Sequence, residues 1–243
     1  MSNKTEKENA EKRIYHFGVY LKNSSKLRIS RENYAIVDNR NTAGNELYAQ
    51  LCMPPEKRKK IYADDACTTY TDEWCQKHRE DCLMNFDLNM KYMQELSSEK
   101  FEEALNAFLL KNKKFIQVFD LNECEGKSGV YMLVLDQYKQ CYIGQSVSIK
   151  KRVMAHWNKT KQFDRLIWGR VENSILSVDS FGALDTTRIF VLYTNDLMRA
   201  ERRLVNSMPS EYCLNRIGGG IGEDDDYKFE IKTTAQSRAL REQ

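Results

Sequence analysis

Hydrophobic and polar positions follow different patterns in the two halves of this chain. The first 13 residues are polar and charged, which indicates a flexible leader. Residues 56–95 carry long charged side chains and no glycine or proline, so they are expected to be helical. A second helix is predicted after an N-cap at Ser98, where apolar residues recur at helical spacing (Phe101, Leu105, Phe108 and Leu109).

From residue 115 onward, short apolar segments bounded by glycines and turn residues predict strands instead. The predicted strands are 115–121, 129–135, 140–144, 167–171 and 188–193. Turn-like residues join the second and third of these into a hairpin. Helices are expected at 148–157 and 196–208, with Pro209 ending the latter. Two more short strands are predicted near the N-terminus, at 16–21 and 34–37.

These patterns divide the 243 residues into four parts. A leader (1–13) precedes a mostly helical N-terminal region (14–115), a mixed α+β domain (116–222) and a C-terminal tail (223–243). The longest apolar runs fall far short of the roughly 20 residues that span a bilayer, so no membrane association is expected. Seven scattered cysteines favour the reduced thiols of a cytoplasmic protein over a disulfide framework.

The charge distribution says more than the net charge. The net charge of +3, from 38 basic and 35 acidic residues, does not by itself indicate a nucleic-acid partner. However, residues 150–170 contain seven Lys or Arg and only one acid, Asp164, with Trp157 and Trp168 among them. Such a stretch fits a phosphate-facing surface. Taken alone, a solvated helix face is favoured over nucleic-acid contact by about two to one.

Two tyrosines are placed together by the predicted hairpin. Gly129-Val130-Tyr131 is followed, after ten residues, by Tyr142-Ile143-Gly144. With a turn centred on residues 137 and 138, Leu133 faces Tyr142 across the hairpin. Tyr131 lies two residues from Leu133 and projects from the same face. Both phenols should therefore converge on one side of the sheet, and a one-residue slip in register would separate them.

The predicted helices that follow add polar side chains. Arg152 and His156 are four residues apart, so they share one helix face and could form a phosphate site beside the tyrosines. On the later helix, Glu201 stands within an otherwise apolar stripe. A carboxylate is costly there unless it pairs with a neighbouring arginine or binds a metal, and both interpretations stay open.

This combination resembles the GIY-YIG nuclease superfamily over residues 116–222. The resemblance rests on two tyrosines, an arginine, a histidine four residues further on, a glutamate and an asparagine before glycines: Tyr131, Tyr142, Arg152, His156, Glu201 and Asn215. Gly18-Val19-Tyr20 repeats the first tripeptide with no Tyr-Ile-Gly nearby. The first tripeptide alone is therefore weak, and the conjunction of all six side chains carries the resemblance.

The resemblance implies an α+β fold with a small three-stranded antiparallel sheet flanked by helices. It also implies hydrolysis of DNA phosphodiester bonds with a single Mg²⁺ or Mn²⁺ bound by Glu201. Either Tyr131 or Tyr142 would be the general base. Arg152 would clamp the phosphate and lower the pKa of the phenol. His156 would contact the phosphate or relay a proton.

Further residues follow from the same resemblance. Substrate contacts would come from Gly144, Gln145, Lys151 and Arg152. Gly129 and Asn215 would support the site, with Asn215 tying the end of the domain to the catalytic helix. The sequence departs from the pattern at Val130, which replaces isoleucine, and at Gln145, where some relatives have lysine. The interval from His156 to Glu201 suggests an insertion near 171–185, which we expect to form a substrate-contacting loop.

Three other chemistries are disfavoured by geometry. A zinc site would draw on Cys67, Cys75, His78 and Cys82, but Cys75 and Cys82 would lie about 10 Å apart along one helix, too far to share an ion. Cys141 alternates with Tyr142 and should point away from His156, which argues against a Cys–His nucleophile. The Gly218–Gly220 cluster has no following lysine or helix signal, so a loop is favoured over a phosphate cradle.

Three functions are compatible with the sequence. The first is a metal-dependent DNA endonuclease, whose N-terminal region would supply target recognition or the contacts of a homodimer. The second is a non-catalytic nucleic-acid-binding module, which would more readily have lost Glu201 or Arg152. The third is a protein-interaction factor acting through its N-terminal helices, which predicts no salt-sensitive affinity for DNA.

Overall fold

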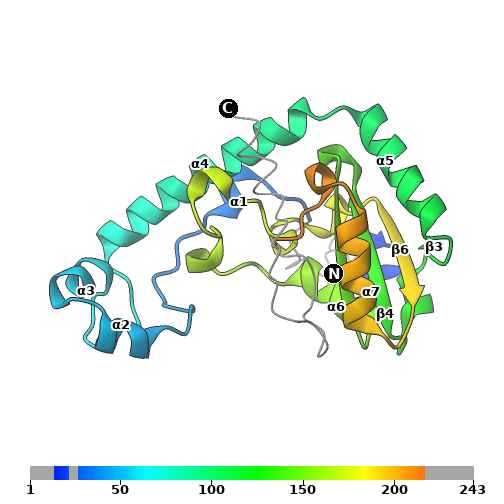
Figure 1. The fold of residues 1–243 in the computed structure, drawn as a ribbon. Helices are drawn as coiled ribbons and strands as arrows, with labels where there is room; N and C mark the ends of the chain where they lie inside the picture. The colour runs from blue at the N-terminus through cyan, green and yellow to red at the C-terminus, as the bar shows by residue number, and fades with distance from the viewer. Residues whose placement is uncertain (1–13, 22–26, 217–243) are drawn as a thin grey trace, which may run out of the picture.

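The structure, a computed structural model, describes residues 14–21 and 27–216. The predicted leader 1–13, the tail 223–243 and the Gly218–Gly220 cluster lie outside the described residues. Figure 1 shows a long helix, α4, that runs from two short helices at one end of the molecule to a sheet packed between helices at the other.

The N-terminal part combines one hairpin with five helices. The hairpin consists of β1 (Ile14–His16) and β2 (Val19–Leu21), which pair antiparallel. The helices that follow are α1 (Arg31–Tyr34), α2 (Glu46–Cys52), α3 (Pro55–Ile61), α4 (Asp72–Glu95) and α5 (Ser98–Lys111).

Local side-chain chemistry explains where these helices differ from the prediction. The predicted helix 56–95 is interrupted at 62–71, because Asp64 turns the chain by accepting hydrogen bonds from the backbone and hydroxyl of Thr68. The predicted strand 34–37 is wrong: Tyr34 is the last residue of α1, which a capping box between Ser30 and Asn33 starts, and residues 35–37 form no strand. The N-cap of α5 is Ser97 rather than Ser98, one residue earlier than predicted.

The second half forms the main sheet. Its strands are β3 (Ile116–Val118), β4 (Gly129–Leu135), β5 (Gln140–Ser146) and β6 (Arg188–Tyr193), in the order β3-β6-β4-β5 and with antiparallel pairing throughout. Two helices follow the strands, α6 (Ile149–Asn158) and α7 (Leu197–Ser207). Residues 167–171 form no strand, so that prediction is wrong; a 3₁₀ turn at Val171–Asn173 follows them.

The α+β class holds, but the expected architecture of one small three-stranded sheet is wrong. The described chain has two sheets, one of four strands and one of two. The fourth strand of the main sheet is β3, which pairs with β6 through Ile116↔Val191 and Val118↔Ile189. The apolar segment at 115–121 was expected to be a strand, yet only tertiary packing shows that it extends this sheet.

The main sheet separates two hydrophobic cores, because successive residues of a strand point to opposite faces. Tyr131 and Leu133 face α6 and pack with its residues Ile149 and Val153, together with residues of α4. The opposite face packs against α5 and α7, through Val130, Met132, Phe101, Leu105, Phe108, Ala200 and Leu204. In Figure 1, α7 lies over β4 on one side of the sheet. Residues on both sides of the predicted boundary at 115 therefore share both cores.

None of the described helices has both the length and the apolar character of a membrane span. All seven cysteines are free thiols, six of them buried.

Asn215 fastens the outer edge of the sheet. Its side-chain oxygen accepts a hydrogen bond from the Ile143 amide (3.0 Å), and its side-chain nitrogen donates to the Ile143 carbonyl (2.7 Å). Next to it, the Leu214 amide donates to the Cys141 carbonyl at 2.8 Å. The segment thus satisfies backbone groups of β5 that an edge strand otherwise leaves unpaired. These bonds hold β5 at Ile143, between Tyr142 and Gly144. The sequence had instead led us to expect that Asn215 ties the end of the domain to the catalytic helix.

We expect Asn215→Ala to lower the free energy of unfolding by about 2–4 kcal/mol, because it leaves both buried backbone groups of Ile143 without partners. Asn215→Asp keeps the acceptor and loses the donor, so its cost should be smaller. Urea denaturation followed by circular dichroism would measure both variants. Equal stability of wild type and Asn215→Ala would contradict this role.

Candidate active site

The hairpin brings the two predicted tyrosines together. In the register of β4 and β5, Leu133 faces Tyr142 and Tyr131 faces Gly144, as the turn position predicted. The two phenol rings lie on the α6 side of the sheet with their centroids 6.3 Å apart. Tyr131 is completely buried, whereas Tyr142 is only partly buried. Tyr142 is therefore the phenol within reach of a substrate.

Glycine is required opposite Tyr131. A Cβ at Gly144 would lie 2.5 Å from Tyr131 Oη and 2.9 Å from Tyr142 Cε1. A Cβ at Gly129 would lie 2.3 Å from the Leu192 carbonyl oxygen, a backbone atom that cannot turn aside. Gly144 therefore allows the Tyr131 phenol to lie across β5, and Gly129 allows β4 to approach β6 at its first residue.

His156 and Asp179 extend from Tyr131 as a chain of hydrogen bonds that runs from the buried phenol to a half-buried carboxylate. His156 Nε2 lies 2.8 Å from Tyr131 Oη, and its Nδ1 lies 2.5 Å from a carboxylate oxygen of Asp179. Burial raises the pKa of Asp179, but the hydrogen bond and charge of His156 outweigh it and hold the pKa below its usual value. An ionised carboxylate can only accept, so Nδ1 donates to Asp179, and in the neutral imidazole Nε2 then accepts the phenolic proton.

Arg152 and Glu201 act on the two phenols with opposite charges. Burial raises the pKa of Tyr131 well above its usual value and that of Tyr142 to about 12. The guanidinium of Arg152, on the exposed side of α6, lowers both values, while the negative charge of Glu201 raises them. Both phenols are therefore neutral at pH 7, and compensation of the Glu201 charge would remove one of the causes that raise their pKa values, while burial would remain the largest.

The remaining predicted residues surround this cluster. Lys151 is exposed on α6 next to Arg152, and Gln145 is half-buried on β5, where it faces Val130 of β4. Glu201 is half-buried on the face of α7 that packs toward the sheet. The tertiary structure thus gathers side chains from two strands and two helices around residues 142–144 of β5, namely Tyr131, Tyr142, Arg152, His156 and Glu201.

Glu201 suits a divalent ion that takes few protein ligands. Within 14–21 and 27–216, no group of three or more His, Cys, Asp or Glu side chains could hold a metal. A single carboxylate that is partly open to solvent could hold a Mg²⁺ ion only with water and phosphate as its other ligands. Of the predicted zinc candidates, Cys75, His78 and Cys82 lie on the unbroken helix α4, and His78 Nε2 bonds the Phe163 carbonyl at 2.9 Å.

Asp179 was not among the site residues predicted from the sequence. It lies in the segment 171–185, which was expected to be a loop that contacts substrate, 23 residues beyond His156 and with no regular spacing to it. One signal was present, since Asp179 is the only charged residue in the otherwise apolar and small run 175–184. A lone carboxylate in such a run requires a partner, and His156 is that partner.

The N-terminal helix α4 holds this segment in place. Asn85 donates from its side chain to the carbonyls of Val171 (2.9 Å) and Ser174 (2.5 Å), and Asn89 donates to Ser174 at 2.9 Å. The side-chain oxygen of Asn89 accepts from the Leu176 amide at 3.3 Å. Both asparagines are fully buried. The N-terminal region therefore helps to position Asp179, and through it His156.

Comparisons of the chain with protein-family models, with curated proteins and with solved structures found no match. A functional assignment therefore rests on the geometry of this cluster and on its chemistry.

We expect Gly144→Ala to cost about 1–3 kcal/mol of stability, because its methyl group would displace the Tyr131 phenol. In a Tyr131→Phe background, the nearest atom is absent and the cost should fall by at least about 0.5 kcal/mol. Urea denaturation of wild type, the two single variants and the double variant measures this coupling. Strictly additive costs would show that the two residues do not constrain each other.

Proposed function

We propose that this protein is a metal-dependent endonuclease of the GIY-YIG type that hydrolyses phosphodiester bonds of DNA. The observation that carries the proposal is the convergence of Tyr131, Tyr142, Arg152 and His156 around residues 142–144 of β5, with Glu201 close enough to act on both phenols. A cytoplasmic location is consistent with its seven free thiols.

Tyr142 is assigned as the general base, because Tyr131 has no exposed surface through which to meet a water molecule. Arg152 holds the phosphate oxygens and favours the phenolate of Tyr142. Tyr131, His156 and Asp179 position this group, since the imidazole of His156 stands edge-on to the Tyr142 ring with centroids 5.2 Å apart. Gln145 and Lys151 flank the site and are assigned to the substrate backbone.

Glu201 would hold one Mg²⁺ or Mn²⁺. When bound, such an ion stabilises the leaving oxygen and offsets the Glu201 charge that now raises the pKa of Tyr142. The proton acceptor, the phosphate clamp and the metal ligand thus come from different elements, which only the folded chain brings together.

The second candidate is a binding module without catalysis. The raised pKa of both phenols supports it, because neutral phenols bind phosphate by hydrogen bonding but do not accept a proton. Nuclease activity distinguishes the two candidates directly.

We expect purified protein to nick or linearise supercoiled plasmid in Mg²⁺ or Mn²⁺ and to stop when the metal is chelated. Glu201→Gln and Tyr142→Phe should each lose at least about 10²-fold in rate. Glu103→Gln, an exposed change on α5, is the matched control and should retain full activity. Several DNA sources are needed, because a sequence-specific enzyme ignores most plasmids.

Cutting that persists in Glu201→Gln would contradict the metal assignment. Intact, salt-sensitive DNA binding without cutting on any DNA would favour the binding module. The absence of salt-sensitive affinity for DNA would favour a protein-interaction factor.

We expect Asp179→Asn to lower the turnover rate by about ten-fold or more while DNA affinity changes less than about two-fold. An asparagine can donate to His156 Nδ1, which would leave Nε2 protonated and turn the Tyr131 hydroxyl away. Single-turnover cleavage beside metal-free DNA binding measures both quantities. A loss of affinity equal to the loss of rate would show that Asp179 acts on binding alone.

A further inference from the structure

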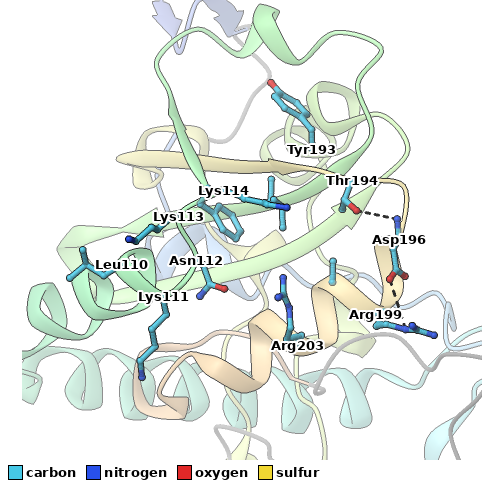
Figure 2. Close-up of a pocket in the computed structure, with 13 residues that line it drawn as sticks. Leu110, Lys111, Asn112, Lys113, Lys114, Tyr193, Thr194, Asp196, Arg199 and Arg203 are labelled. Carbon is cyan, nitrogen blue, oxygen red and sulfur yellow. Dashed lines mark hydrogen bonds and ion pairs between the residues drawn. The ribbon is translucent and has the colours of Figure 1, made fainter.

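A basic groove lies on the other side of α7 from Glu201. It has a volume of about 620 Å³ and is formed by the end of α5, the start of α7 and the end of β6. Five cations line it, namely Lys111, Lys113, Lys114, Arg199 and Arg203, against a single acid, Asp196. Figure 2 shows Arg203 directed from α7 into the groove, opposite the lysines. None of the candidate catalytic residues lines it.

The cations of the groove are available to a ligand. All five are exposed to solvent. In the described part of the chain, no carboxylate forms an ion pair with the three lysines or with Arg203. Arg199 forms an exposed pair with Asp196 at 3.8 Å, which Figure 2 also draws. The uncompensated charge of the three lysines and Arg203 attracts anions.

The helices themselves do not account for this charge. Lysines at the end of α5 complement its dipole, but Arg199 lies in the first turn of α7, where acidic residues are favoured. Arg199 and Arg203 are four residues apart and so lie about 6 Å from each other along the helix. The cations thus line both walls rather than converging on one point, which fits an extended chain of negative charges better than a single small anion.

The groove lies across the main sheet from the two phenols, because Phe115, Leu192 and Ala200 belong to the core under α5 and α7, whereas Tyr131 packs on the α6 side. Leu192 and Tyr193 of the groove stand at the end of β6, where Tyr193 faces Gly129, and Gly129 also faces Ser146 at the end of β5. Arg199 and Arg203 project from the opposite side of α7 to Glu201, and one helix is about 10–12 Å across. At about 3.4 Å per nucleotide along one strand, the width of α7 alone spans about three nucleotides, and Arg152 and Tyr142 lie farther from the groove than that, on the other face of the sheet.

We propose that this groove binds the sugar–phosphate backbone of the DNA substrate at a distance from the cut, while the scissile phosphate lies at Arg152 and Tyr142. The inference rests on the proposed function and extends it to a second substrate-binding surface. The buried floor of Phe115, Leu192 and Ala200 offers an apolar surface to the sugars, and the two basic walls contact the phosphates. Contacts of this kind fix the register of the duplex without reading its sequence.

The test compares two double variants that remove the same charge. Lys113→Gln/Arg203→Gln takes one cation from each wall of the groove. Lys91→Gln/Lys100→Gln removes two exposed lysines near the junction of α4 and α5, where Lys100 lies about 16 Å from Lys111 along α5. Affinity for a fluorescent DNA duplex is measured by anisotropy without metal, over a series of salt concentrations.

The groove variant should bind about ten-fold or more weakly at low salt, and its slope of log affinity against log salt should decrease by about 2, close to one unit for each lost phosphate contact. The control should match the wild type. Thermal unfolding of all three proteins shows whether the exposed substitutions leave the fold intact.

A slope equal to that of the control, with steep salt dependence in the wild type, would overturn the groove and leave the proposed function standing. Wild-type binding that does not respond to salt would overturn both. A polyglutamate peptide serves as a second probe: if the groove variant loses affinity for the peptide alone, the groove belongs to an acidic protein partner and the proposal is wrong.

Discussion

The candidate site depends on the close approach of Tyr131 to Gly144 across the β4–β5 hairpin. The phenol occupies the space that any side chain at Gly144 would fill, so the register of the two strands and the position of the ring are a single constraint. From this fixed point the hydroxyl reaches His156 on α6. Asn215 holds β5 from its outer edge, so the strand cannot move away from the phenol.

The N-terminal region takes part in this arrangement, although it carries none of the family-like residues. Two buried asparagines of α4 bind the segment that presents Asp179 to His156. Polar groups buried this deeply are costly unless every one is satisfied. The contacts therefore specify one geometry for the segment. A substitution in α4 could therefore alter the geometry of the site through Asp179 and His156, without changing a residue that contacts the reacting groups.

Helix α7 separates two electrostatic environments. One side presents Glu201 toward the phenols, and the other presents Arg199 and Arg203 to the basic groove. The net charge of +3 hides this segregation, because acids and bases are nearly equal in number but unevenly placed. The basic stretch 150–170 is visible in the sequence because its residues are consecutive. The groove cations are not, because they come from segments more than 80 residues apart.

Local and short-range patterns determined much of this protein from the sequence alone. The strands 129–135 and 188–193, the register of the hairpin and the pairing of Arg152 with His156 on one helix face depend on neighbours a few residues away. Only the tertiary structure decided that β3 adds a fourth strand, that Asp179 meets His156 and that lysines after α5 line one groove with Arg203. Those contacts join segments without any common periodicity, so packing and burial, rather than local preference, select them.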